Sequence, residues 1–205
     1  MTQTYEVFIG EGRIRIADEA DNATFNPTVV NNPKKGELID AIVQLERKSK
    51  NEIWITGDVN TNWELFNSVH HVINAAGGLV SNHEGKWLFI HRNGKWELPK
   101  GKLESFEKPE EAGKREVSEE CGISEPTLKK ELTITYHTYS QDDQRFLKRT
   151  YWYLMNYSGN EQPIPQVEEG IDKIVWVEIE LIPPLLDDSY PSIIRVVEAA
   201  FLLTN

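Results

Sequence analysis

The residues most able to do chemistry are glutamates gathered in one short stretch of the chain. Glu116, Glu119 and Glu120 follow Pro109 and precede Gly122, and a proline at the start with a glycine just past the end is typical of a helix. On a helix these three carboxylates share one face, where like charges repel each other. They also lie toward the C-terminal end, where the helix dipole disfavours anions. Such a face needs compensating positive charge.

Two sources of that positive charge are conceivable. Arg115 reaches Glu119 one turn on, but one cation cannot balance the helix carboxylates together with Glu107, which lies just before the helix. A hard divalent cation with oxygen ligands can, and Mg²⁺ or Mn²⁺ is the natural choice. Such an ion also binds phosphate oxygens and lowers the pKa of an attacking water. The alternative is an acidic helix face turned to solvent, which the spacing alone does not exclude.

The complete pattern around these residues is more specific than the glutamates alone. The segment GKLESFEKPEEAGKREVSEECGI contains a glycine, a glutamate six positions later, and then Arg-Glu, an aliphatic residue, Glu-Glu, a glycine and an aliphatic residue at fixed spacing. A chance match is on the order of one in 10⁹ per starting position. This pattern is the Nudix box, and the chain resembles Nudix hydrolases from about residue 72 to its end. The matching residues are Gly101, Glu107, Arg115, Glu116, Val117, Glu119, Glu120, Gly122 and Ile123.

The resemblance implies a fold, a reaction and a set of metal ligands. Nudix hydrolases are α/β/α sandwiches with a mixed sheet, and they hydrolyse nucleoside diphosphates linked to a further group. For this chain we therefore expect hydrolysis of a phosphoanhydride bond in a small-molecule substrate, with Mg²⁺ or Mn²⁺ as cofactor. The expected metal ligands are Glu116, Glu119, Glu120 and the carbonyl oxygen of Gly101, a residue whose lack of a side chain lets the backbone turn tightly.

Catalytic roles also follow from the position in the box. Glu116 matches the glutamate that acts as general base in some members, and the sequence leaves open which glutamate does so here. The resemblance implies that Arg115 orients a neighbouring carboxylate and that Glu107 supports the metal shell. Many members add a glutamate from a later loop, where Glu168 and Glu169 stand, although a solvent-exposed pair is the alternative. The expected catalytic residues are Glu116, Glu119, Arg115 and Glu169.

Two box positions depart from the usual family residues. Lys108 stands where many members have Ser or Thr, so the N-cap of the helix is weaker. Gly113 replaces a usual alanine, which is expected to cost the helix up to about 1 kcal/mol. Neither position bears on the chemistry.

The substrate is indicated by residues outside the box. The proline that is typical of members acting on ADP-ribose is absent at Thr138 and Tyr139. The segment WELPKGK resembles the entry to the box in hydrolases of diadenosine polyphosphates and diphosphoinositol phosphates. We therefore expect a dinucleoside polyphosphate first, while nucleoside triphosphates, nucleotide sugars and diphosphoinositol phosphates stay open. The expected substrate-binding residues are Lys100, Lys102, Lys148 and Arg149 for phosphates, and Tyr139 and Tyr151 for a base.

The elements that must position these residues fall into two parts. Residues 1–70 read as a small α/β unit of unknown role, and residues 71–205 as the Nudix hydrolase domain. Apolar alternation predicts strands and 3.6-residue spacing predicts helices. The expected strands are 5–9, 13–17, 52–56, 72–80, 86–91, 96–98, 127–140, 147–157 and 171–177, and the expected helices are 38–45, 63–69, 109–121 and 192–203.

Composition limits the partners and the setting. The net charge of −11 over 205 residues disfavours nucleic acid and anionic membranes as partners. Cys121 is the one cysteine, so no intrachain disulfide can form, and a cytoplasmic setting is expected. The first residues lack the features of a signal peptide, and no apolar run approaches the roughly 20 residues that span a bilayer.

Two other readings of the chain stay open. A Nudix-like module without catalysis could bind a nucleotide and signal through residues 1–70, although a sensor has no need to keep every box carboxylate. Residues 1–70 could also serve as a lid or support a homodimer, which the sequence does not decide.

Overall fold

The computed structural model describes residues 3–20 and 27–204, and contacts divide the chain into two compact units. The first unit contains residues 1–73 and 136–148, and the second contains residues 74–135 and 149–205. The chain therefore passes from one unit to the other three times. Each unit has its own buried core.

The first unit combines a mixed sheet with two helices. Its elements are β1 (Tyr5–Ile9), β2 (Gly12–Ala17), β3 (Thr28–Asn31), α1 (Lys35–Glu46), β4 (Glu52–Thr56), α2 (Val59–Ser68) and the connected ends of β9 (Thr127–Gln141) and β10 (Gln144–Asn156). The strand order is β9-β1-β2-β4-β3. β1 and β2 pair antiparallel, whereas β2 with β4, β4 with β3 and β1 with β9 pair in parallel. The predicted α/β fold with a mixed sheet is confirmed.

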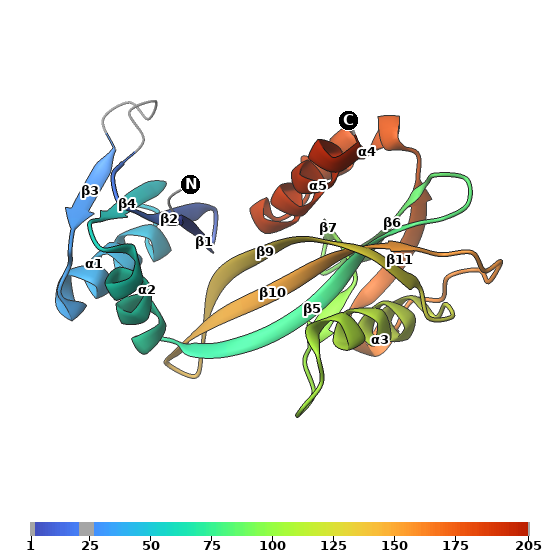
Figure 1. The fold of residues 1–205 in the computed structure, drawn as a ribbon, viewed down its shortest axis with the longest axis horizontal. Helices are drawn as coiled ribbons and strands as arrows, with labels where there is room; N and C mark the ends of the chain where they lie inside the picture. The colour runs from blue at the N-terminus through green and yellow to red at the C-terminus, as the bar shows by residue number, and fades with distance from the viewer. Residues whose placement is uncertain (1–2, 21–26, 205) are drawn as a thin grey trace. The chain divides into compact units, whose positions relative to one another are not determined.

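Alternating aliphatic residues make one face of this sheet apolar. Ile14 and Ile16 on β2, and Ile53 and Ile55 on β4, are fully buried, because residues two apart on a strand point to the same side. Both helices lie on one side of these strands (Figure 1) and fill the core from there. Their core residues are Leu38, Ala41, Ile42, Leu45, Val59 and Phe66.

The hairpin tip between β9 and β10 belongs to this core. β9 pairs with β1 at Val7↔Tyr136, and Leu147 of β10 is fully buried in the same cluster. The turn residues Asp142 and Asp143 have φ values of 52° and 58°, the left-handed conformation that suits a tight two-residue hairpin. The sequence assigns residues 136–148 to the second part of the chain. Its local pattern predicts the strands correctly but does not encode which distant core they enter.

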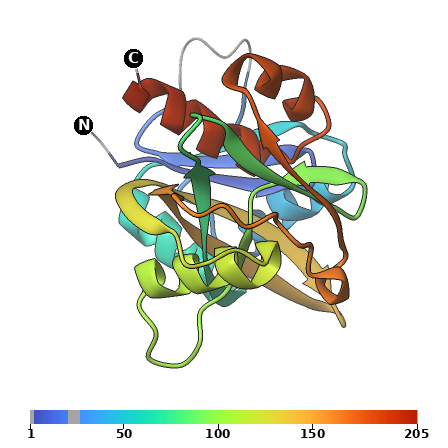
Figure 2. The same cartoon turned by 90° about the vertical axis from the view of Figure 1, so that its right-hand side faces the viewer.

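The second unit is an α/β/α sandwich. Its elements are β5 (His71–Ser81), β6 (Trp87–Arg92), β7 (Lys95–Glu97), β8 (Lys100–Lys102), α3 (Pro109–Cys121), η1 (Val167–Glu169), β11 (Ile171–Val177), η2 (Ile179–Leu181), α4 (Ile182–Leu186) and α5 (Pro191–Thr204), with the remaining parts of β9 and β10. The strand order is β11-β6-β5-β10-β9, with β7 on β6 and β8 on β5. α3 and α5 lie on opposite sides of these strands (Figures 1 and 2).

Two apolar clusters hold the sandwich together, one on each side of the strands. Alternation along β10 supplies both, since Trp152 packs in the cluster with α5 and Tyr153 packs in the cluster with α3. The α3 residues in its cluster are Ala112, Val117 and Cys121, and the α5 residues in the other are Ile193, Val196, Val197 and Ala200. The strands are therefore covered on both faces, as the sequence predicts.

The sequence locates the long elements well and misses short ones. The predicted bounds 52–56, 109–121 and 171–177 agree with β4, α3 and β11. The short strands β3 and β8 are not predicted, because three or four residues carry too little alternation to be recognised. In the described part of the chain, no helix is both long and apolar enough to cross a membrane.

We predict that Leu147→Ala destabilises the first unit by about 2–4 kcal/mol, because it removes a fully buried side chain that the hairpin contributes to that core. Hydrogen exchange followed by mass spectrometry is expected to show faster exchange in α1 and β2. Leu202→Ala is the matched control, since Leu202 is exposed. Unchanged exchange in α1 and β2 of the Leu147 variant would show that the hairpin does not support this core.

A second prediction concerns pH and His70. Burial lowers the pKa of His70 in the fold. Its Nδ1 lies 2.7 Å from the carbonyl oxygen of Phe66, and its buried Nε2 has no hydrogen-bond partner among residues 3–20 and 27–204. Unfolded histidine takes up a proton near pH 6.5. The stability that neutral His70 provides is thus complete above about pH 6.5 and falls as the pH drops toward the folded pKa.

The melting temperature measured from pH 7.5 to 5.5 tests this. The wild type is expected to lose more stability over this range than His70→Gln, whereas His83→Gln, at an exposed position, is expected to follow the wild type. Equal slopes for the wild type and the His70 variant would refute the assignment.

Candidate functional site

α3 positions the box carboxylates, and local sequence signals define its ends. Pro109 occupies the first turn, where its missing N–H costs nothing, and the Glu111 side chain accepts a hydrogen bond from the Lys108 backbone N–H at 3.3 Å. Gly122 ends the helix in the left-handed conformation, with φ 60°. Thus the helix predicted from the sequence is confirmed, including both of its ends.

Arg115 donates hydrogen bonds to three carboxylates of the site. Its Nε and Nη2 donate to the two oxygens of Glu107 at 2.8 and 2.9 Å, in a bidentate pair. Its Nη1 donates to Glu116 at 2.8 Å and to Glu119 at 2.9 Å, and its Nη2 also donates to the carbonyl oxygen of Lys102 at 3.1 Å. One guanidinium therefore joins the box loop to two carboxylates on the helix.

Glu120 is the most deeply buried carboxylate of the box, with 2% of its surface exposed. It accepts hydrogen bonds from the Lys100 backbone N–H and from Nη1 of Arg92, both at 2.9 Å. Burial raises the pKa of Glu120 to about 7, against the opposing effect of Lys100 and Arg92. The site thus holds a carboxylate whose charge is costly unless a cation lies beside it.

Arg92 links that buried carboxylate to the loop before β11. Its Nη2 donates to Glu169 at 2.6 Å while its Nη1 holds Glu120. Glu169 is exposed, as Glu168 is, but its ion pair with Arg92 connects it to the box carboxylate Glu120. Arg92 itself is not predicted, because a single arginine at a strand end carries no spacing signal. It comes next to Glu169 through the pairing of β6 with β11, in which Arg92 faces Ile171.

Gly101 leaves the space that Glu116 occupies. It lies in β8 opposite Ala76 of β5, and a Cβ atom added there would overlap the Glu116 carboxylate. Burial raises the pKa of Glu116, and the charges of Glu119 and Glu169 raise it further, while the Arg115 guanidinium opposes the shift. The Glu116 carboxylate can therefore occupy this position only because residue 101 has no side chain.

Comparison with known proteins agrees with this geometry. The NUDIX domain family matches residues 71–198, more than half of the chain. The chain belongs to the Nudix family. An RNA pyrophosphohydrolase of Bartonella henselae is 31% identical over 137 residues, which cover 55% of this chain and 79% of that protein. The match confirms the Nudix pyrophosphohydrolase domain predicted from the box.

Other relatives and a solved structure give the same picture. A mutator protein named MutT4 from Mycobacterium tuberculosis is 34% identical over 113 residues, covering 54% of this chain and 44% of that protein, so the chain spans less than half of this relative. The ORF135 protein of Escherichia coli has a similar fold, with a TM-score of 0.52 and 22% identity over 67% of this chain and 94% of that one.

Nudix hydrolases use divalent metal ions, and the donor set here suits one. The carboxylates of Glu107, Glu116, Glu119, Glu120 and Glu169 face two guanidinium groups, so negative charge is in excess. Carboxylate oxygens are the ligands that Mg²⁺ and Mn²⁺ prefer. Within the described ranges no three acidic, His or Cys side chains converge on a single point, because these carboxylates turn to the guanidinium groups instead.

The residues predicted to bind substrate are distributed over both units. The Lys100 ammonium forms an ion pair with the largely buried Glu97, and the Lys102 side chain is exposed. Arg149 and Tyr151 belong to the second unit, with the box. Tyr139 and Lys148 belong to the first unit, where Tyr139 stacks on Phe146 with ring centroids 5.2 Å apart. Their roles stay predictions.

We predict that Gly101→Ala weakens metal binding and kcat/KM by about 10–100-fold, because the new methyl group displaces Glu116. Titration calorimetry with Mn²⁺ and a hydrolysis assay measure the two effects. Gly36→Ala adds the same methyl group where nothing lies within 4 Å and is expected to behave as the wild type. Normal Mn²⁺ affinity in the Gly101 variant would show that the position of Glu116 does not matter.

Proposed function

We propose that this Nudix protein hydrolyses a phosphoanhydride bond in a compound in which a polyphosphate is attached to a nucleoside, and that it depends on Mg²⁺ or Mn²⁺. The observation that carries the proposal is the cluster of box carboxylates, with Glu120 buried at its base and Arg115 and Arg92 at its sides. A buried carboxylate held beside further carboxylates is costly in a fold without function. A divalent metal ion, which also coordinates the polyphosphate, would supply the missing positive charge.

The chain's own residues then have separate tasks. Glu116, Glu119, Glu120 and the Gly101 carbonyl hold the metal, which screens phosphate charge and activates the attacking water when bound. Glu116 would accept the proton of that water, as the matching glutamate does in some members, whereas Glu107 is held by two hydrogen bonds from Arg115. Arg115 keeps Glu107 in place throughout. Glu169 extends the carboxylate cluster through Arg92.

For the substrate we propose a dinucleoside polyphosphate first. The support is the WELPKGK segment, which leads directly from β7 into the box, and the basic residues Lys102 and Arg149, which lie in the same unit as the box carboxylates. Basic side chains suit phosphates that the metal does not cover. The two terminal phosphoryl groups of such a compound each carry a nucleoside, so cleavage leaves two nucleotide products that chromatography can identify.

The 5′-triphosphate end of an RNA is the second candidate. The observation in its favour is that three relatives carry the name RNA pyrophosphohydrolase, from Bartonella henselae at 31% identity and from Bartonella tribocorum and Bartonella quintana at 28%. The net charge of −11 opposes extended contact with an RNA backbone. An RNA end can still offer the same polyphosphate to the box without such contact.

A panel of substrates with product identification separates these candidates. Diadenosine tetraphosphate, 5′-triphosphorylated RNA, nucleoside triphosphates, a nucleotide sugar and a diphosphoinositol phosphate are compared by kcat/KM in Mg²⁺, in Mn²⁺ and with EDTA. We expect the diadenosine compound to be cleaved fastest, and only with metal. Faster cleavage of the RNA would assign the second candidate. No turnover on any compound, with binding that does not need metal, would favour a sensor.

We predict that Glu120→Gln lowers kcat/KM by on the order of 100-fold, because it removes a buried charge from the proposed metal shell while keeping the shape of the side chain. Glu104→Gln is the matched control, since Glu104 is an exposed glutamate of the same box loop and is expected to keep wild-type turnover. Chromatography of the released nucleotides measures both. Equal turnover of the two variants would remove Glu120 from the mechanism.

A further inference from the structure

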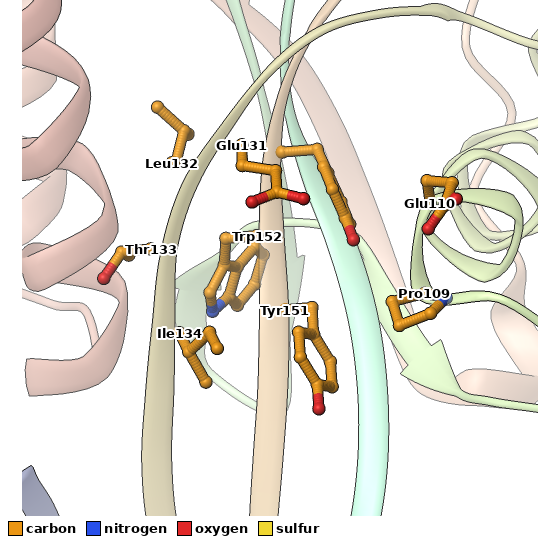
Figure 3. A pocket seen from close by; sticks show the side chains of 9 residues that line it. Pro109, Glu110, Glu131, Leu132, Thr133, Ile134, Tyr151 and Trp152 are labelled. Carbon is orange, nitrogen blue, oxygen red and sulfur yellow. The ribbon is translucent and has the colours of Figure 1, made fainter.

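The second unit contains a pocket of about 280 Å³ beside the first turn of α3 (Figure 3). Glu110 lines it from α3, Glu131 from β9, and Tyr151 and Tyr153 from β10. Trp152 also lines the pocket, although its side chain packs in the α5 cluster on the other face of the strands. The pocket thus combines two carboxylates with aromatic rings.

This pocket lies on the other flank of α3 from the metal site. With 3.6 residues per turn, the six residues from Glu110 to Glu116 place these side chains about 120° apart around the helix. The core face of the helix, with Gly113 and Val117, lies between the two directions. A ligand in the pocket therefore does not share the carboxylates of the Nudix box.

Three polar side chains of the pocket, Glu110, Glu131 and Tyr153, have no hydrogen-bond or ion-pair partner in the part of the chain that the structure describes. Among the described residues, neither Glu110 nor Glu131 has a cation within ion-pair distance, and neither forms a hydrogen bond through its side chain. Tyr153 is 4% exposed, and its hydroxyl group has no hydrogen-bond partner in the same set of residues. Burial raises the pKa of Tyr153 to about 12, and the negative charges of Glu110 and Glu131 raise it further. Both carboxylates therefore act on the hydroxyl group of the same largely buried side chain.

We propose that this pocket binds an aliphatic diamine or polyamine, with its ammonium groups at Glu110 and Glu131 and its methylene chain against Tyr151 and Tyr153. Two uncompensated carboxylates exclude an anion and favour a cation over a neutral ring. Ammonium groups also interact favourably with the faces of aromatic rings, and the methylene chain covers apolar surface. The Tyr153 hydroxyl can accept a hydrogen bond from the ligand, which gives this hydroxyl group a partner.

Titration calorimetry with spermidine, without nucleotide or added metal, tests the proposal independently of the hydrolase activity. The wild type is expected to bind one spermidine, and the double variant Glu110→Gln/Glu131→Gln is expected to bind it at least about tenfold more weakly, because two charge-assisted contacts are lost. The matched control is Glu19→Gln/Glu180→Gln, which removes the same net charge at two exposed positions. It is expected to bind spermidine as the wild type does.

Three results would overturn the proposal. Equal spermidine affinity in the wild type and the Glu110/Glu131 variant would place binding elsewhere. Equally weakened spermidine binding in the control variant would show that spermidine is attracted by the net negative charge of the chain and not by this pocket. Tighter binding of guanosine than of spermidine, lost in the Glu110/Glu131 variant, would assign the pocket to a nucleobase. Melting temperatures of all variants establish that each one is folded, and Tyr153→Phe adds a variant that keeps both charges and removes only the hydroxyl group.

Discussion

The second unit depends on the control of repulsion among carboxylates that the fold brings together. Glu116 and Glu119 share one guanidinium nitrogen of Arg115, and Glu120 and Glu169 share the guanidinium group of Arg92. Each arginine uses several of its donors, which only the planar, forked guanidinium group allows. Without these two residues, only Lys100 among the described residues would offset the negative charge of Glu120, and the other carboxylates would lose their hydrogen-bond donors.

In α3, Gly113 is unfavourable for the helix itself but favourable for its packing against β10. Gly113 lowers the helix propensity of α3, as the sequence predicts, but an added Cβ atom would lie 3.2 Å from Cε of Met155 and 3.3 Å from Cδ2 of Tyr153. The glycine therefore lets α3 approach β10 closely. That approach holds Val117 in the core while Glu116 and Glu120 stay aligned with β8. Gly113 thus lowers the intrinsic stability of the helix but allows the close packing that positions Glu116 and Glu120.

The sequence predicts the site as far as local pattern determines it. The ends of α3 follow from Pro109 and Gly122, and the carboxylate face follows from helical spacing, so both are predicted correctly. Arg92 could not be found in this way, because its place beside Glu169 depends on the pairing of β6 with β11. The same limit applies to Leu147: its strand is predicted from the sequence, but its place in the core of the first unit is not. The local pattern of a single sequence does not indicate which distant strands pair with each other.

Electrostatics separates the two flanks of α3 and gives them different tasks. On the flank with Glu116 and Glu119, arginine side chains already neutralise part of the charge, so an incoming ion must bring enough charge to displace a guanidinium group. A divalent metal ion, as proposed for this site, carries twice the charge of a guanidinium group. On the flank with Glu110, no described cation competes, and the adjacent rings of Tyr151 and Tyr153 offer apolar surface that a hydrated metal ion does not use. An organic ammonium ion uses both the charge and the rings, and this difference in surroundings, rather than the number of carboxylates, distinguishes the two sites.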